Sequence, residues 1–351
     1  MWFHKSRFLN ILRVLGPLFL IAGIFVLVYP ARSVTAASME GKQVKNTPTG
    51  DEVPVIISIT PVPVETPEPI EAPTPTPSPT PTPVPTLTPT PSPKFADKFT
   101  DEVIETDTSY TSPDISYSWY SVTDSENYSD IVTYYVADIY VKDATLIRTG
   151  FSSGSYHSMA YRSMQFVSDK VGAVLAISGD FARFRDFGLV IRNGEVCRTK
   201  LDNSRDVGVL YRDGTFKTYL ARKVPLDEIL ASDPWQSWCF GPSLLDEHGY
   251  AKSKFNTDVG KINPRAVFGY YEPGHYCFVL VDGRQEGYSG GMTMSELSSL
   301  MESLGCTAAI NLDGGATAQI AWRGKVFNHP PKYRDLHDII YLGESEYASG
   351  Q

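Results

Sequence analysis

The 351-residue sequence has few cysteines and no extended cluster of basic residues after its N-terminus. Its formal net charge is -9, so it lacks the basic stripe that nucleic-acid-binding proteins present, and we expect no nucleic-acid partner. The cysteines show neither CxxC nor Cys/His spacing, which argues against a zinc site. Acidic residues at strand ends could hold Ca²⁺, but no EF-hand spacing is present, so the sequence identifies no metal ligands, leaves open whether a metal is needed and names no cofactor. The four cysteines are Cys197, Cys239, Cys277 and Cys306. After export they could form one or two disulfides, and they could equally remain buried thiols.

Proline is scarce in the C-terminal part of the chain, because most of the 26 prolines precede residue 95. From Pro61 to Pro93 the sequence is nearly a Pro-Thr repeat, which favours an extended polyproline II conformation. At about 3.1 Å per residue, such a spacer could reach on the order of 100 Å. We interpret residues 38–95 as a disordered Pro/Thr-rich linker. The C-terminal two-thirds is long enough to bury a sizeable core.

The N-terminal residues have the pattern of an export signal. Lys5, Arg7 and Arg13 precede an uninterrupted run of apolar, Gly and Pro residues at 14–29, an order that keeps the basic end in the cytoplasm. The run is slightly short for a membrane span and slightly long for the core of a signal peptide. We predict that residues 1–37 are retained as a single-pass cell-membrane anchor, with the C-terminal domain outside. Secretion after cleavage in the small-residue stretch 34–37 is the alternative.

Strand patterns outnumber helix patterns after a lead-in segment at 96–129. Asn193-Gly194 and Asp213-Gly214 each join two short β-rich runs, as in two-residue hairpins. Helices are expected at 157–170 and at 293–304, where Thr293 and Glu296 have the spacing of a capping box. Residues 130–345 are therefore predicted to form one α+β domain, with a mixed, mostly antiparallel sheet and a few packing helices.

Polar residues follow the ends of apolar strands in three stretches, which is where binding sites are often built. The stretches are 176–181, 263–284 and 309–317. Their order resembles the phosphodiester glycosidases, a family of enzymes that split a sugar from a phosphate. The matching motifs are SGDF at 178–181, PRAVFG at 264–269, DGR at 282–284, GMT at 291–293 and NLDGGAT at 311–317. Five motifs in order are specific, whereas one alone would be weak.

The resemblance covers roughly residues 130–343 and has three departures. Ser178 stands where the family usually has Asn, Ala316 where it has a third Gly, and Thr317 where Ser is common. An added methyl group at 316 could crowd a tight turn. The role of position 178 stays open.

The resemblance implies cleavage at the anomeric carbon, with a phosphomonoester as the leaving group. Such a site needs cations or N–H donors at the phosphate and a carboxylate near the oxocarbenium-like carbon. The candidate carboxylates are Asp180, Asp282 and Asp313, each of which could otherwise be a turn or cap residue. We predict that Arg265 and Arg284 bind the phosphate, since a guanidinium can hold two of its oxygens.

Further candidates come from the same motifs. Gly314 and Gly315 would let backbone N–H groups approach an anion closely. Asn311 and Thr317 could bind sugar hydroxyls or phosphate, and Thr293 is included through the matched GMT segment. Arg183 and Arg185 could line the pocket or face water.

These observations predict an extracytoplasmic hydrolase that cleaves a glycosyl-1-phosphodiester bond in a cell-envelope or exopolysaccharide glycan. The alternative is a non-catalytic envelope module that binds anionic polysaccharide or assists its assembly. The sequence does not identify the sugar or the group across the phosphate.

Overall fold

The computed structural model of the chain describes residues 93–345. The predicted anchor at 1–37 and nearly all of the predicted linker at 38–95 lie outside the described residues. Within residues 93–345, no helix is long and apolar enough to cross a membrane.

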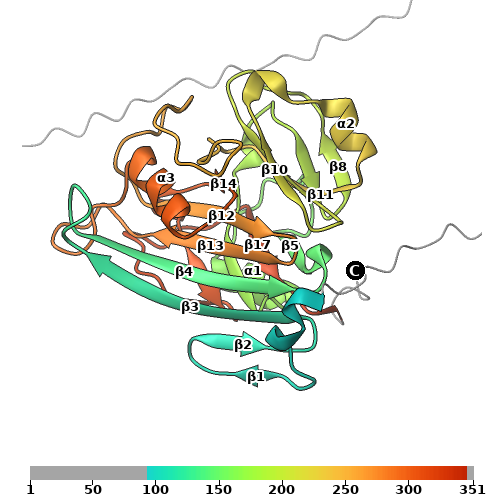
Figure 1. Ribbon diagram of the computed structural model, residues 1–351, viewed down its shortest axis with the longest axis horizontal. Coiled ribbons are helices and arrows are strands. Elements are labelled where there is room, and N and C mark those ends of the chain that lie inside the picture. Colours follow the sequence, from blue (N-terminus) through green and yellow to red (C-terminus); the bar gives the residue numbers. More distant parts are fainter. Residues whose placement is uncertain (1–92, 346–351) are drawn as a thin grey trace, which may run out of the picture. The chain divides into compact units, whose positions relative to one another are not determined.

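A seven-stranded antiparallel sheet forms one layer of the domain (Figure 1). Its strands alternate in the direction of their side chains. Phe278 faces the central core, whereas its neighbour Val279 faces the opposite side. In spatial order the strands are β1 (Ile104–Glu105), β2 (Ser109–Thr111), β3 (Ile115–Asp124), β4 (Val132–Val141), β13 (His275–Val281), β12 (Arg265–Glu272) and β14 (Ala308–Asn311).

A five-stranded antiparallel sheet packs against the first one. Ile177 and Ile340 from this sheet share a buried cluster with Phe278 of the seven-stranded sheet. The strands, in spatial order, are β16 (Lys325–Val326), β15 (Ile320–Trp322), β6 (Leu175–Ser178), β17 (Asp338–Leu342) and β5 (Ile147–Phe151). The largest core of the domain therefore lies between two sheets.

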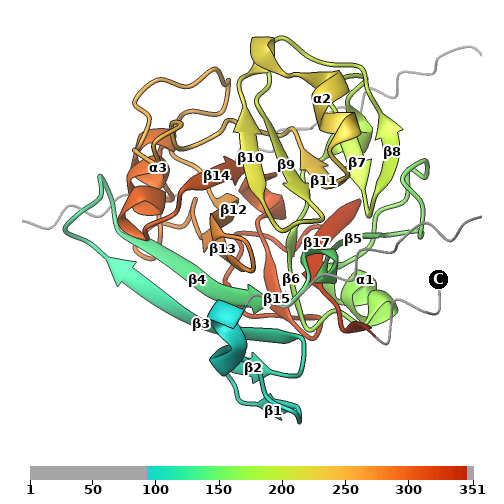
Figure 2. The ribbon, with the colours of Figure 1, turned by 45° about the vertical axis from the view of Figure 1, so that its right-hand side comes forward.

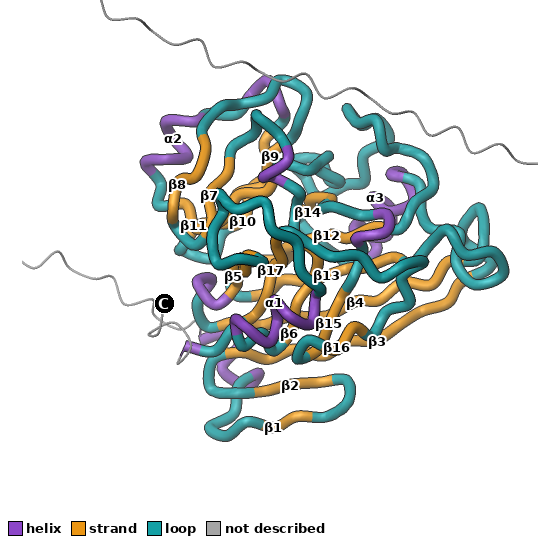
Figure 3. The backbone as a smooth tube through the Cα atoms, turned by 180° about the vertical axis from the view of Figure 1, so that it is seen from behind, coloured by secondary structure: helices purple, strands orange, loops and turns teal. Residues whose placement is uncertain are grey.

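Two helices cover the outer faces of these sheets (Figure 3). In α3 (Met294–Ser303), Leu297 packs with Val279 on the seven-stranded sheet. In α1 (Met164–Val171), Val167 packs with Ile339 on the five-stranded sheet. The layers follow the order helix, sheet, sheet, helix.

A smaller group of strands lies beside one end of the two sheets (Figure 2). Its strands are β7 (Val190–Arg192), β8 (Glu195–Arg198), β9 (Val207–Tyr211), β10 (Phe216–Tyr219) and β11 (Pro234–Trp238). Helix α2 (Leu226–Ala231) packs here through Ile229. Five 3₁₀ helices complete the described elements: η1 (Pro93–Lys98), η2 (Ala144–Leu146), η3 (Ala182–Phe184), η4 (Ala221–Lys223) and η5 (Gly315–Thr317).

The predicted α+β class, with mostly antiparallel strands, is confirmed. The predicted capping box is also present: the Thr293 hydroxyl accepts from the Glu296 N–H at 3.2 Å, and the Glu296 carboxylate accepts from the Thr293 N–H at 2.8 Å. The helix predicted at 157–170 is wrong in its first half. It begins only at Met164, because the Ser163 side chain caps it by accepting from the Phe166 N–H at 3.2 Å.

All four cysteines are free thiols in the structure. Cys277 and Cys306 lie in one buried cluster with their Sγ atoms 3.6 Å apart, and Cys239 is buried elsewhere. These three match the alternative of unpaired thiols that pack as small apolar residues, whereas Cys197 is only half-buried.

Candidate active site

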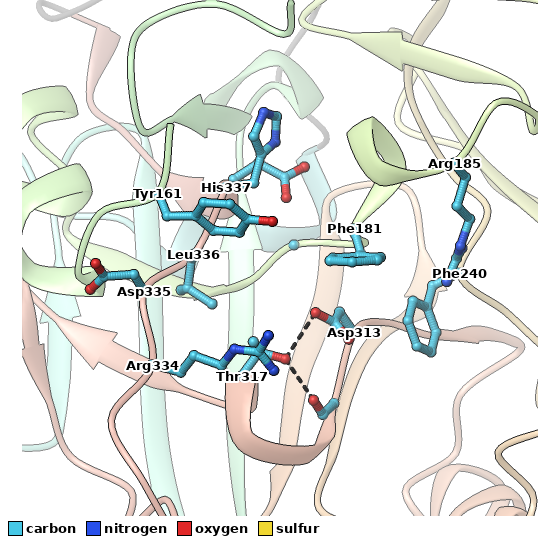
Figure 4. A pocket seen from close by; sticks show the side chains of 13 residues that line it. Tyr161, Phe181, Arg185, Phe240, Asp313, Thr317, Arg334, Asp335, Leu336 and His337 are labelled. Atoms are coloured by element: carbon cyan, nitrogen blue, oxygen red, sulfur yellow. Dashed lines mark hydrogen bonds between the residues drawn. The ribbon is translucent and has the colours of Figure 1, made fainter. Parts of the chain in front are cut away.

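A pocket of about 220 Å³ lies where β6 and β14 end and β17 begins (Figure 4). Its wall combines three kinds of side chain. The acids are Asp313, Asp335 and Asp338, the cations are Arg185 and Arg334, and the aromatic residues are Tyr161, Phe181 and Phe240. A pocket lined by acids, guanidinium groups and aromatic rings is suited to bind an anionic sugar derivative.

Backbone hydrogen bonds tie the three strand ends together. The Asp313 N–H donates to the Gly179 carbonyl at 3.0 Å, and the Gly179 N–H donates to the Asp338 carbonyl at 3.2 Å. The fully buried Ser178 donates its hydroxyl to the Asp313 carbonyl at 3.2 Å. Ser178 thus fixes the backbone that carries Asp313, which gives a role to the position where the sequence departs from the family pattern.

Asp313 lies on the pocket wall with most of its surface covered. Its Oδ2 accepts a hydrogen bond from the Thr317 hydroxyl at 2.8 Å, and the same hydroxyl lies 2.6 Å from the Gly314 carbonyl (Figure 4). Burial raises the pKa of Asp313 to about 6, against the lowering effects of Thr317 and Arg185. A carboxyl group with this pKa can exchange a proton near neutral pH.

The turn after Asp313 requires its glycines. A Cβ on Gly314 would lie 2.6 Å from the Pro264 carbonyl oxygen, and Gly315 has a φ of +65°. Ala316 does not have a positive φ, so its methyl group is compatible with the turn. The Gly315 N–H donates to the Pro264 carbonyl at 3.0 Å and thus serves the turn, while Gly314 lines the pocket.

The guanidinium groups of the pocket differ from the two that the motifs suggested. Arg185 lies 4.6 Å from the centre of the Phe240 ring and donates to the Cys239 carbonyl at 3.3 Å. Arg334 is exposed and lies across the pocket from Arg185 in Figure 4. Both are available to a bound anion.

Arg265 and Arg284 are not among the residues that line this pocket. Arg265 is 2% exposed and donates from Nε to the Met292 carbonyl at 3.0 Å. Burial lowers the pKa of Arg265 to about 10, with a smaller contribution from Arg284. Arg284 is exposed and donates to the Asn263 side chain at 2.7 Å. The structure places both in the turn region behind Gly314 and Gly315.

Asp180 and Asp282 are buried and also lie outside the pocket lining. Arg192 donates to Asp180 at 2.5 Å, so this carboxylate is half of a buried ion pair. Asp282 accepts from the Asn328 side chain at 2.8 Å and from the Tyr288 hydroxyl at 2.8 Å. Both carboxylates are hydrogen bonded by the protein, which suits a positioning role, and their predicted catalytic role stays a prediction.

Asn311 and Thr293 lie away from the pocket as well. Asn311 is buried, and its amide donates to the Gly241 carbonyl at 2.9 Å. Thr293 uses its hydroxyl to cap α3. Of the predicted site residues, the structure therefore gathers Asp313, Gly314 and Thr317 in one pocket.

Sequence reasoning missed several residues of the pocket wall, namely Tyr161, Phe240, Arg334, His337 and Asp338. Only Asp338 had a usable signal, because it is an acid at the start of the last predicted strand. In residues 93–345, no group of three or more His, Cys, Asp or Glu side chains is arranged to hold a metal ion.

Comparison with known proteins supports the resemblance found in the sequence. The sequence model of the phosphodiester glycosidase family matches residues 171–342, which lie within the folded domain and confirm the predicted resemblance to that family. The catalytic domain of zebrafish N-acetylglucosamine-1-phosphodiester alpha-N-acetylglucosaminidase, auto-inhibited by its pro-peptide, superposes with a TM-score of 0.55. The alignment has 17% identity and covers 69% of this chain and 88% of the zebrafish structure, so it shows a shared fold.

A curated relative is more similar over a shorter stretch. The SPbeta prophage-derived uncharacterized protein YomE of Bacillus subtilis (strain 168) is 33% identical over 123 residues. These residues are 34% of this chain but 19% of YomE, so the match spans only a small part of that protein.

Proposed function

We propose that the chain hydrolyses a glycosyl-1-phosphodiester, breaking the bond between the anomeric carbon and oxygen. The observation that carries this proposal is Asp313, a pocket carboxyl group whose pKa is raised to about 6 by burial, flanked by Arg185 and Arg334. The match of residues 171–342 to the phosphodiester glycosidase family model supports the same reaction class.

The two guanidinium groups suit the phosphate, because each can donate two hydrogen bonds to its oxygens. Arg185 is held against the Phe240 ring, which limits its freedom before substrate binds. The exposed Tyr161 and the half-buried Phe181 offer ring surfaces to the apolar face of a sugar.

Asp313 in its ionised form then acts at the anomeric carbon, either as the nucleophile or as the base that activates water. Its hydrogen bond from Thr317 orients the carboxylate. Because the ionised form is required, kcat/KM should fall as the pH drops below about 6.

The test is release of free sugar from a UDP-sugar and from a sugar-1-phosphoryl alcohol by the full chain. Asp313→Asn should lower kcat/KM by roughly 10²–10⁴-fold, the usual range for losing an acid–base group. Asp213→Asn is the matched control, because Asp213 lies in the β9–β10 turn outside the pocket and should leave the rate unchanged. Equal rates for Asp313→Asn and wild type would remove Asp313 from the chemistry.

The cellular setting belongs to the same proposal. The export pattern at 1–37 and the Pro/Thr-rich spacer at 38–95 support a membrane-anchored enzyme that acts on an envelope or exopolysaccharide glycan outside the cell. N-terminal sequencing of the mature chain tests the anchor. If the mature chain starts after residue 36 or 37 and is recovered from the medium, the membrane anchor is wrong and the protein is secreted after cleavage.

The non-catalytic alternative drew its support from the departures at 178 and 316. Ser178 holds the Asp313 backbone, and Ala316 fits its turn. Neither departure blocks the pocket, so no feature of the described residues favours binding without turnover.

A further inference from the structure

The acids in and behind the pocket differ in how fully their carboxylates are hydrogen bonded. Asp180 accepts three hydrogen bonds, from the Ala182 N–H at 3.2 Å, the Cys239 N–H at 2.9 Å and Arg192 at 2.5 Å. Asp282 also accepts three, including the His329 N–H at 2.9 Å. Carboxylates that accept this many hydrogen bonds from the protein have little capacity left to accept one from a substrate.

Asp338 is the opposite case. It is 5% exposed and lines the pocket, and within residues 93–345 only its own backbone N–H donates to its carboxyl group. Its nearest cation is Arg192, whose NH2 lies 3.7 Å from Asp338 but 2.5 Å from Asp180. A carboxyl group on a pocket wall that accepts no hydrogen bond from another residue has free capacity for a ligand.

The local charge balance favours a neutral Asp338. One buried guanidinium, Arg192, faces the two buried carboxyl groups of Asp180 and Asp338 and sits closer to Asp180. If both acids were ionised, one negative charge would remain uncompensated away from water, which is costly. A proton on Asp338 removes that cost.

The other charged groups near Asp338 act in both directions. Burial raises the pKa of Asp338 and Asp180 raises it further, whereas Arg192 and His337 lower it. Asp313, Arg334 and Asp335 face the same pocket from neighbouring segments. The net effect of these groups is a raised pKa of Asp338.

Gly179 gives the Asp338 carboxyl group its room. A Cβ at position 179 would lie 2.6 Å from the Asp338 Cγ and 2.9 Å from its carbonyl oxygen. Because Gly179 has no side chain, the Asp338 carboxyl group fits beside it at the start of β17, on the pocket wall that also carries Asp313.

We propose that Asp338 is a second catalytic carboxyl group, which acts as a neutral acid on the phosphate of the substrate. The inference rests on the proposed function. Asp338 donates a hydrogen bond to the bound phosphate, where an ionised carboxylate would repel it.

As the bond from the anomeric carbon to oxygen breaks, the proton of Asp338 passes to the leaving phosphate oxygen. The oxygen of water bonds to the anomeric carbon, either directly or after a covalent intermediate on Asp313. One proton of that water stays on the new hydroxyl group of the sugar. The other is taken up by Asp313 and passes to Asp338, which restores the ionised Asp313 and the neutral Asp338, so the products are a free sugar and a phosphomonoester.

The experiment measures kcat/KM against pH for sugar release from a sugar-1-phosphoryl alcohol by the full chain. The wild type should show two limbs: an acid limb near pH 6 from Asp313 and an alkaline limb from loss of the Asp338 proton. Asp338→Asn should lower the optimum rate by about 10²-fold, the low end of the range because a phosphomonoester leaves readily. It should also abolish the alkaline limb and keep the acid limb.

Two variants of neighbouring pocket residues serve as controls. Asp335→Asn and His337→Gln should both retain the alkaline limb, because neither removes the proton in question. An alkaline limb that persists in Asp338→Asn overturns the inference, as does one that disappears in His337→Gln. If Asp338→Asn does not fold, a wild-type profile that stays flat above the acid limb overturns it equally. A wild type that turns over no phosphodiester overturns the proposed function, and this inference with it.

Discussion

Replacing Arg192 by methionine should destabilise the domain by about 3–5 kcal/mol at neutral pH, the usual cost of stranding a buried charge. Arg192 is 2% exposed and pairs with Asp180 at 2.5 Å. Its other terminal nitrogen donates to the Ile191 carbonyl at 3.1 Å and to the Ser237 carbonyl. Methionine fills similar volume but leaves the Asp180 carboxylate and both carbonyl groups without their donor.

The loss in free energy of unfolding caused by Arg192→Met should decrease as the pH falls. Without the cation, the buried carboxyl groups bind protons more readily in the folded than in the unfolded chain. The penalty is therefore largest at pH 7 and shrinks as the pH falls and the acids become neutral. Urea unfolding of wild type and Arg192→Met at pH 7 and at acidic pH measures it.

Two comparisons isolate the charge effect. Arg212→Met is the matched control, because the Arg212 side chain is 41% exposed and pairs with an exposed acid, Asp233, at 3.2 Å; its cost should stay below about 1 kcal/mol. The double variant Arg192→Met/Asp180→Asn should regain more than half of the lost stability. A pH-independent deficit, or one below about 1 kcal/mol, would show that the stranded charge is not the cause.

Three further predictions concern single side chains. Asp313→Asn should raise the free energy of unfolding at pH 7 by about 1–2 kcal/mol, a figure discounted for partial exposure, because the pKa of Asp313 in the folded chain, about 6, lies above the usual 3.8. The gain should vanish below the usual pKa of 3.8, where the acid is neutral in both the folded and the unfolded chain. A gain that urea unfolding finds to be equal at acidic pH contradicts this reasoning. Thr293→Ala should cost about 1 kcal/mol in thermal unfolding through loss of the α3 cap, whereas Thr293→Ser should be near neutral; equal losses would exclude capping as the cause. Gly179→Ala should displace the Asp338 carboxyl group, because the added Cβ would lie 2.6 Å from the Asp338 Cγ, and should lower kcat/KM on the order of 10²-fold. A Gly179→Ala variant with wild-type kcat/KM would show that the position of Asp338 does not affect catalysis.

Local features of the fold could be predicted from the sequence because their causes are local. The Asn193-Gly194 turn and the Thr293 capping box depend on residues within a few positions of each other. The start of α1 could not be placed, because Ser163 competes as a cap inside a pattern that looked helical from residue 157.

The site was harder to predict, since its acids are distinguished by long-range contacts. Sequence motifs gave Asp180 and Asp313 equal standing. Only the fold shows that Asp180 forms a buried ion pair with Arg192 of β7, whereas the Asp313 side chain lines the pocket. Asp338 carries no motif, and its position beside Gly179 depends on strand pairing between β6 and β17.

The proposed mechanism requires that water attacks the sugar carbon and not the phosphorus. Hydrolysis of a sugar-1-phosphoryl alcohol by the full chain in ¹⁸O-labelled water, followed by mass spectrometry of both products, distinguishes the two. A glycosidase mechanism centred on Asp313 predicts ¹⁸O in the released sugar and none in the phosphomonoester. Label in the phosphate product would mean cleavage of the phosphorus–oxygen bond and would contradict the proposed mechanism.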